Sequence, residues 1–292
     1  MKNEKIGIVT VLYKSETVLE DFFRTLNEQS YKNFILYVID NKSPDNSLDK
    51  SKEFAKSAWF ETKFIENDDN YGVAKGNNQG IEAALKDSCD YVLLSNNDVV
   101  LKPDTIKKLY DGLIENNADM VVPKIYFYGT NKIWNIGGKI TWYNGTIKSF
   151  GYKKEDKGQF DKHIKIDSAA TCFMLIKKKV FSIVGLMDEK YFVYYDDLDF
   201  VYRAMQKGQK LVYIYNSTLE HKESTSSGVT SDFSVFYNIR NRIYFAKKHR
   251  RFSYFFYIEN LLYHYSIRWL KMNKNRRQWR LMLKAIHEGV VL

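Results

Sequence analysis

Side chains able to bind a metal ion or a nucleotide follow four apolar stretches of the N-terminal third. Residues 13–16 (Tyr-Lys-Ser-Glu) and 40–45 (Asp-Asn-Lys-Ser-Pro-Asp) follow the first two stretches. Residues 67–72 (Asn-Asp-Asp-Asn-Tyr-Gly) and 96–98 (Asn-Asn-Asp) follow the next two. Carboxylate oxygens ligate hard cations, and amides hydrogen-bond ribose or a base. Such residues also favour turns and helix caps, but four consecutive occurrences favour a ligand site.

A second acidic cluster, residues 188–199, lies among aromatic side chains and precedes Arg203. Desolvation and like-charge repulsion raise the pKa of at least one carboxyl group in such a cluster, as a general base requires. A capped helix start is the alternative interpretation, because acidic residues favour that position. Farther on, His221 precedes a polar segment, residues 223–231, which we expect to be a mobile loop; a lone histidine is more often structural or solvated.

Three glycines lie in residues 70–80, where they would permit close approach of the backbone to a ligand. No Gly-x-Gly-x-x-Gly motif follows the first apolar stretch, and no phosphate loop ending in Gly-Lys-Ser/Thr is present. These absences argue against a dinucleotide site and against a P-loop nucleotide site.

The elements that position these residues are predicted by alternating apolar periodicities, which indicate βα units and a mostly parallel sheet. We expect strands at 6–13, 34–39, 63–66, 91–95 and 120–128, and helices at 16–29, 46–57, 76–86 and 103–116. Residues 129–176 suit hairpins and loops. Helices are then expected at 177–184 and 197–207, a strand at 211–215, and helical structure from residue 231 onward.

Taken in order, these blocks resemble the family 2 glycosyltransferases with a GT-A fold. The likeness is strongest to the bacterial branch that includes rhamnosyltransferases and other surface-polysaccharide enzymes. It covers roughly residues 5 to 245. The matching blocks are 9–13, 38–43, 70–80, 93–98, 185–199, His221 and 237–241.

The resemblance implies an α/β, Rossmann-like nucleotide-diphospho-sugar transferase fold with a mostly parallel central sheet and a C-terminal helical extension. Residues 1–230 would form the catalytic domain, with a nucleotide-binding part (about 1–127) and an acceptor-side part (about 128–230). The implied reaction moves a sugar from a UDP- or dTDP-sugar to a hydroxyl of a glycan or lipid-linked glycan, with inversion. Such an enzyme would act in cell-surface polysaccharide biosynthesis.

The resemblance also implies roles for individual residues. Asp197 would be the catalytic base, with Asp196 beside it, and Asp98 with His221 would bind Mg²⁺ or Mn²⁺. The implied nucleotide-sugar contacts are Asp40 at the base with the backbone of Leu12 and Tyr13, then Asn70, Gly72, Asn77 and Asn97, with Arg203, Arg240 or the 223–231 segment at the diphosphate. Two departures weaken the match: Asn96 replaces one metal carboxylate, and Asp196-Asp197 replaces Glu-Asp.

All the excess positive charge of the 292 residues lies at the C-terminal end. The net charge is +10, and residues 231–292, a predicted basic aromatic helical region, include a 240–292 tract with 13 Lys or Arg, 2 Glu and 11 aromatic residues. Such a tract suits contact with an anionic membrane surface, but also a helical subdomain packed on the core. We expect a cytoplasmic protein, peripheral on the membrane at most, because no apolar run is long enough to span a bilayer.

Three further expectations concern thiols and alternative functions. Cys89 and Cys172 show no metal-ligand spacing and are expected to be buried, reduced thiols. A nucleotidyltransferase is a second candidate function, although residues 13–16 lack the Gly-rich basic loop it would need. A non-enzymatic nucleic-acid binder is a third, and the near-neutral, acid-rimmed main domain argues against any nucleic-acid partner. The oligomeric state stays open.

Overall fold

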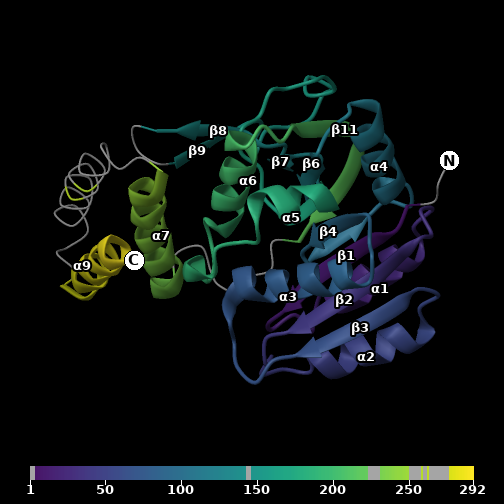
Figure 1. Ribbon diagram of the computed structural model, residues 1–292, viewed down its shortest axis with the longest axis horizontal. Coiled ribbons are helices and arrows are strands. Elements are labelled where there is room, and N and C mark those ends of the chain that lie inside the picture. Colours follow the sequence, from purple (N-terminus) through teal and green to yellow (C-terminus); the bar gives the residue numbers. More distant parts are fainter. Residues whose placement is uncertain (1–3, 143–145, 223–230, 250–257, 259–261, 263–275) are drawn as a thin grey trace.

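A mixed sheet of nine strands forms the centre of the part of the chain that the structure describes (Figure 1). This computed structural model describes residues 4–142, 146–222, 231–249, 258, 262 and 276–292. The sheet order is β3-β2-β1-β4-β10-β6-β11-β5, with β7 paired to β6. The strands are β1 (Ile6–Leu12), β2 (Phe34–Asp40), β3 (Glu61–Glu66), β4 (Tyr91–Ser95), β5 (Val99–Leu101), β6 (Met120–Phe127), β7 (Ile133–Asn135), β10 (Phe173–Lys177) and β11 (Leu211–His221). A separate hairpin pairs β8 (Gly138–Thr141) with β9 (Thr146–Ser149).

The parallel part of the sheet agrees with the alternating sequence pattern. β1 pairs in parallel with β2 and β4, and β2 pairs in parallel with β3. β10 differs, because it lies antiparallel between β4 and β6. It comes from the tract expected to contain only hairpins and loops. Its residues Phe173 to Ile176 are all fully buried, so they form a short apolar run without the alternation that marks a half-exposed strand.

Helices cover both faces of the sheet. α1 (Leu19–Asn27), α2 (Ser47–Ser57) and α4 (Thr105–Glu115) pack into one hydrophobic core. α3 (Gly72–Lys86), α5 (Lys178–Val184) and α6 (Asp196–Gln206) pack into the other. Neighbouring residues of β1 serve opposite cores, with Ile8 in the first and Val9 in the second. This arrangement leaves the carboxyl ends of β1, β2 and β4 as the open edge.

Helix α3 begins at Gly72, before the predicted start at residue 76. A Cβ at Gly76 would lie 2.9 Å from Val11 Cγ1, and a Cβ at Gly80 would lie 2.3 Å from Val9 Cγ1. Both glycines therefore allow α3 to pack closely on β1. The interpretation of these two glycines as points of ligand approach is wrong, since the neighbour they approach is the sheet.

Strand β11 extends to His221, beyond the predicted end at residue 215. Its pairing with β6 shifts register between Ile214 and Thr218, and the polar residues at this irregularity hid the second half of the strand from the sequence pattern. That second half also pairs with β5, where His221 lies opposite Val99. The extended strand thus carries a histidine to the edge where β4 ends.

The C-terminal region is helical where it is described. α7 (Asp232–His249) packs against α9 (Arg276–Val291), and Figure 1 shows the two helices at one end of the molecule, away from α1 and α2. The basic aromatic residues between them lie largely outside the described residues, as do residues 223–230 of the loop predicted at 223–231. Within the described ranges, no helix is both long and apolar enough to cross a membrane. Cys89 and Cys172 are free and buried, as expected.

Candidate active site

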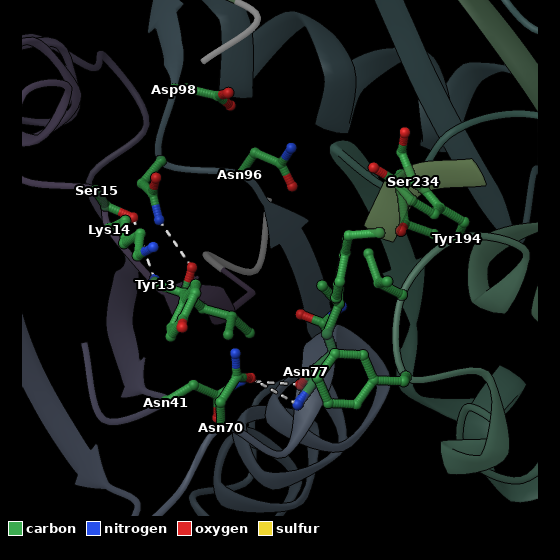
Figure 2. Close-up of a pocket in the computed structure, with 18 of the residues that line it drawn as sticks. Tyr13, Lys14, Ser15, Asn41, Asn70, Asn77, Asn96, Asp98, Tyr194 and Ser234 are labelled. Atoms are coloured by element: carbon green, nitrogen blue, oxygen red, sulfur yellow. Dashed lines mark hydrogen bonds between the residues drawn. The ribbon is translucent and has the colours of Figure 1, made fainter. Parts of the chain in front are cut away.

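A cavity of about 830 Å³ opens at the carboxyl ends of β1, β2 and β4. Open α/β sheets bind ligands at this edge. Figure 2 shows Tyr13, Ser15, Asn41 and Asn70 on one side and Tyr194 on the other. The lining residues are Val11, Tyr13, Lys14, Ser15, Asn41, Asn70, Gly72, Val73, Asn77, Ser95, Asn96, Asn97, Asp98, Thr171, Phe192, Val193, Tyr194, His221, Ser231, Phe233, Ser234 and Asn238.

An amide network fixes the wall between β2 and α3. Asn41 Nδ2 donates to the carbonyl of Gly72 at 2.9 Å, and Asn67 Nδ2 donates to Asn41 Oδ1 at 2.9 Å. Asn70 Oδ1 accepts from the Gly72 N–H at 3.0 Å. Gly72 itself has φ +82°, and a Cβ there would lie 2.4 Å from the carbonyl oxygen of Phe192. The wall is therefore preorganised, and glycine is required where the two walls of the cavity meet.

Only one of the three residues expected at the nucleobase lines the cavity. Tyr13 lines the cavity, whereas Leu12 and Asp40 are buried and are not among its lining residues. The Asp40 carboxylate accepts from the N–H of Ser43 at 3.2 Å. Its neighbour Asn41 lines the cavity instead. The Asp40 carboxylate therefore stabilises the loop that follows β2.

Asn77 and Asn97, two of the residues expected to contact the nucleotide sugar, both line the cavity. The Nδ2 atom of Asn77 lies 3.7 Å from Met187 Sδ, and Asn78 beside it exchanges hydrogen bonds with the backbone of Met187 at 2.9 and 3.0 Å. Asn97 Nδ2 donates to the carbonyl of Val11 at 2.8 Å, which ties the end of β4 to β1. These amides hold three separate chain segments around one cavity.

Figure 2 shows Asp98 at the opposite end of the cavity from Asn70, and His221 lies beside Asp98. Asp98 Oδ1 lies 3.1 Å from His221 Nε2, and both side chains are largely buried. The Lys222 N–H donates to the Asp98 carbonyl at 2.8 Å, so backbone pairing fixes the two residues together. Trp134 stacks on the His221 ring with centroids 4.2 Å apart. The imidazole orientation is thus set by a neighbouring strand and an aromatic ring.

The pair fits a divalent cation as two of its ligands. Octahedral Mg²⁺ holds its ligands at about 2.0–2.1 Å, so two adjacent ligand atoms lie about 3 Å apart. The separation of the Asp98 and His221 atoms matches that spacing. Among the described residues, no group of three or more His, Cys, Asp and Glu side chains could hold a metal. A cation here would need further ligands from a bound diphosphate and from water.

Asp196 and Asp197 begin α6, next to but not among the lining residues of the cavity. Asp197 accepts hydrogen bonds from the N–H of Leu198 at 2.7 Å and from the N–H of Thr171, a lining residue. Burial raises the pKa of the Asp197 carboxyl. Burial, with the charge of Asp197 as a second cause, raises the pKa of Asp196 to about 8. Such elevated values are typical of carboxyl groups that exchange protons in catalysis.

The two arginines expected at the diphosphate are engaged elsewhere. Arg203 Nε donates to Asp199 Oδ2 at 2.7 Å, and its Nη atoms donate to the carbonyls of Val184 and Leu186 at 3.0 and 2.8 Å. Arg240 is buried, and its Nε donates to Asn241 Oδ1 at 2.8 Å. Neither arginine is among the lining residues. The structure therefore corrects their expected placement: both guanidinium groups bind the protein itself.

Among the described residues that line the cavity, Lys14 is the one Lys or Arg. It follows β1 directly and has φ +56°, a left-handed backbone that turns the chain at the cavity rim. The 223–230 segment contains no Lys or Arg. The sequence signal that could have identified Lys14 is its position immediately after the first strand. Phe233, Ser234 and Asn238 of α7 were also missed, because they belong to the region interpreted as an extension.

Comparison with known proteins gives one family match. The family model described as "Glycosyl transferase family 2" matches residues 7–185. The chain is 25% identical over 248 residues to the low-salt glycan biosynthesis hexosyltransferase Agl10 of Haloferax volcanii, covering 82% of this chain and 74% of that protein. It is 24% identical over 260 residues to the dTDP-rhamnosyl transferase RfbF of Shigella flexneri, covering 84% and 81%.

Among solved structures, the chain is similar to GalNAc-T7 crystallised with UDP, GalNAc and Mn²⁺. The TM-score is 0.64 at 14% sequence identity, and the match covers 84% of this chain and 48% of that chain. This likeness concerns the fold, which is the GT-A type expected from the sequence.

Proposed function

The chain belongs to glycosyl transferase family 2, and from this we propose that it is a hexosyltransferase acting with inversion on a nucleoside-diphosphate sugar. The donor would be a UDP- or dTDP-sugar, and the acceptor a hydroxyl of a glycan or lipid-linked glycan. Relatives named for glycan biosynthesis and for dTDP-rhamnosyl transfer support a role in cell-surface polysaccharide synthesis. The family match favours sugar transfer over the two alternatives, nucleotidyl transfer and nucleic-acid binding.

The observation that carries this proposal is the layout of the cavity. An amide wall at Asn41 and Asn70 faces one end, and the Asp98–His221 pair lies at the other. The first can hydrogen-bond a nucleoside, and the second suits a cation on a diphosphate. The carboxyl groups of buried Asp196 and half-buried Asp197 lie beside the cavity at the start of α6, where Asp197 accepts a hydrogen bond from the lining residue Thr171. A nucleotide sugar offers a matching part to each of these three groups: its nucleoside, its diphosphate and its reacting carbon.

In the proposed mechanism, Asp197 takes the proton of the acceptor hydroxyl while the hydroxyl oxygen attacks the anomeric carbon. Burial favours this step, because a carboxylate of raised pKa is a stronger base. The attack on the face opposite the diphosphate inverts the anomeric configuration. Asp98 and His221 would hold Mg²⁺ or Mn²⁺, which stabilises negative charge on the leaving diphosphate when bound. Lys14 adds a positive charge at the same cavity.

The position of the enzyme in the cell is part of the proposal. We place it in the cytoplasm, with contact between the 240–292 tract and an anionic membrane surface. In the described part of α9, the basic side chains of Arg280 and Lys284 are exposed. A lipid-linked acceptor would lie at that surface, so such contact would bring enzyme and acceptor together.

A thermal-shift panel tests the proposed donor. The protein is heated with UDP-, dTDP- and GDP-sugars, each with and without Mn²⁺. A ligand that binds the folded state raises the melting temperature by mass action. We expect stabilisation by a UDP- or dTDP-sugar that is larger with Mn²⁺. No stabilisation by any nucleotide sugar, in either condition, would contradict the proposal.

A further inference from the structure

The segment that leads into Asp196 and Asp197 has a backbone that non-glycine residues rarely adopt. Phe192, Tyr194 and Tyr195 have φ values of 62°, 62° and 66°. At Phe192 ψ is −59°, and the N–H of Val193 donates to the Tyr191 carbonyl at 2.7 Å. These features define a γ-turn of the rare, strained kind. Strained conformations persist only where their surroundings hold them, and they are frequent at active sites.

Asn241 of α7 holds this segment through a single amide group. The two N–H groups of its Nδ2 atom are shared among the carbonyl oxygens of Tyr191, Val193 and Tyr194, which lie 2.8, 2.7 and 2.9 Å from the nitrogen. The Asn241 side chain is fully buried. The three carbonyls can converge on one nitrogen only while the backbone keeps its turns. An amide in this position therefore selects the strained conformation over an extended one.

Arg240 and α3 secure the two remaining carbonyls of this stretch. Arg240 Nη2 donates to the carbonyl of Lys190, and the Val73 N–H at the start of α3 donates to the carbonyl of Phe192 at 2.6 Å. The Arg240 Nε also donates to Asn241 Oδ1 at 2.8 Å, which orients the amide. Five consecutive carbonyls, from residue 190 to residue 194, thus have donors from α7 or α3. We call this set of hydrogen bonds the α7 clamp.

The clamped segment forms one wall of the cavity and leads directly into α6. Phe192, Val193 and Tyr194 line the cavity, and Asp196 and Asp197 follow within the same turn of chain. Any change in the backbone at residues 192–195 would move both the wall and the carboxyl groups. The orientation of α7 is therefore coupled to the position of the proposed base.

We propose that Asn241 and Arg240 are positioning residues, which hold the 190–195 segment so that Asp197 faces the reacting atoms. They act through the backbone, and neither side chain lines the cavity. The kinetic part of this inference rests on the proposed function. The conformational part does not, because the clamp can be tested without any substrate.

The test compares Asn241→Ala with a matched loss of a buried amide elsewhere. Gln29 is fully buried, and its Nε2 donates to the carbonyls of Thr25 and Lys102 at 2.9 and 2.8 Å, away from the cavity. Gln29→Ala therefore removes comparable hydrogen bonds without touching the clamp. Arg240→Lys is a milder second variant that keeps the charge but loses the contact orienting Asn241. Amide hydrogen exchange is measured by mass spectrometry on the peptides that cover residues 190–199.

In Asn241→Ala we expect exchange in this segment to accelerate about tenfold or more, while Gln29→Ala leaves it unchanged. Arg240→Lys should change exchange in the same direction by a smaller factor. With a donor and acceptor in hand, Asn241→Ala should lower kcat about tenfold or more, because misplaced catalytic groups lose rate steeply. The affinity for UDP and Mn²⁺ should stay within about twofold.

Two results would overturn the clamp: unchanged exchange at residues 190–199 in Asn241→Ala, or equal kcat losses in Asn241→Ala and Gln29→Ala. If the wild-type protein turns over no nucleotide sugar, the proposed function fails, and the exchange comparison still decides whether the clamp exists. If Asn241→Ala does not fold, the Arg240→Lys variant provides the same comparison.

Discussion

Asp98 Oδ1 lies 3.1 Å from His221 Nε2, although one follows β4 and the other ends β11. We predict that Asp98→Asn and His221→Ala each weaken the binding of UDP in the presence of Mn²⁺ by roughly tenfold to a hundredfold. The loss should vanish when Mn²⁺ is replaced by EDTA. Isothermal titration calorimetry measures both conditions. His163→Ala is the control, since His163 is exposed, and unchanged Mn²⁺-dependent affinity in both site variants would exclude this pair as metal ligands.

Asp197→Asn should abolish sugar transfer with donor binding retained. An amide cannot accept the acceptor's proton, and general-base catalysis contributes about 10²- to 10⁴-fold to rate. We therefore expect kcat to fall by roughly that factor and the affinity for UDP to stay within about threefold. Turnover assays with wild-type protein as reference measure kcat, and calorimetry measures the affinity for UDP. Turnover near the wild-type rate would reject Asp197 as the base.

Asp196 makes stability depend on pH in a predictable direction. Burial raises its pKa from 3.8 to about 8, so the folded chain keeps a proton that the unfolded chain loses. Between these two pH values the free energy of unfolding should fall as pH rises, by at most about 1.4 kcal/mol per pH unit. Asp196→Asn removes this contribution, and denaturant unfolding at several pH values measures the difference.

The control for that comparison is Asp49→Asn, which changes an exposed carboxylate on α2. It should keep the wild-type pH dependence. Identical slopes for wild type and Asp196→Asn between pH 5 and pH 7 would show that Asp196 titrates normally in the folded protein.

Lys14 and Arg203 should respond to substitution in opposite ways. Lys14→Ala should weaken UDP binding by about tenfold with little change in stability, because an exposed cation at the cavity is lost. Arg203→Ala should leave UDP affinity unchanged but destabilise the fold by about 1–3 kcal/mol, since Asp199 is fully buried and loses one of its partners. Calorimetry and urea unfolding separate the two effects. A weaker UDP affinity in Arg203→Ala would contradict this placement and indicate that Arg203 contacts the diphosphate.

Membrane contact can be tested by charge reversal rather than truncation, because α9 packs on α7. We predict that Arg280→Glu with Lys284→Glu lowers the partition coefficient onto anionic vesicles by about thirtyfold or more, as each of the two basic residues near such a surface contributes about 1 kcal/mol. The control pair, Lys32→Glu with Lys56→Glu, changes the net charge equally on exposed residues elsewhere. Equal recovery of wild-type protein and both variants in the supernatant would reject membrane contact.

Local patterns were enough to predict the first half of the sheet. The β1, β2 and β4 strands are continuous apolar runs and α1 has a clear apolar period, and the polar residues of the site follow the strand ends. β10 was missed although it is as apolar as β4, because it is short and ends a tract whose Gly-Gly and Asn-Gly pairs favour hairpins and loops. The second half of β11 was missed because polar residues interrupt it where its register with β6 shifts.

Residue pairings across the fold explain the errors at the site. Nothing near Arg203 in the sequence shows that its Nη atoms will bind the carbonyls of Val184 and Leu186, so a free cation was expected there. Asn241 stands in a matching block, but its three carbonyl partners lie some fifty residues away. The Asp98–His221 juxtaposition was implied by family resemblance, and no local periodicity could have supplied it.

The strand order also governs how a newly made chain acquires its site. β4 and β6 are not neighbours, because β10 lies between them and pairs with both. The apolar edge of β4 therefore stays uncovered until residue 177 has left the ribosome, and an uncovered strand edge is prone to aggregation. His221 joins Val99 later still. A nascent chain would thus complete its amide wall well before it acquires its histidine, so the two ends of the site form at different times during synthesis.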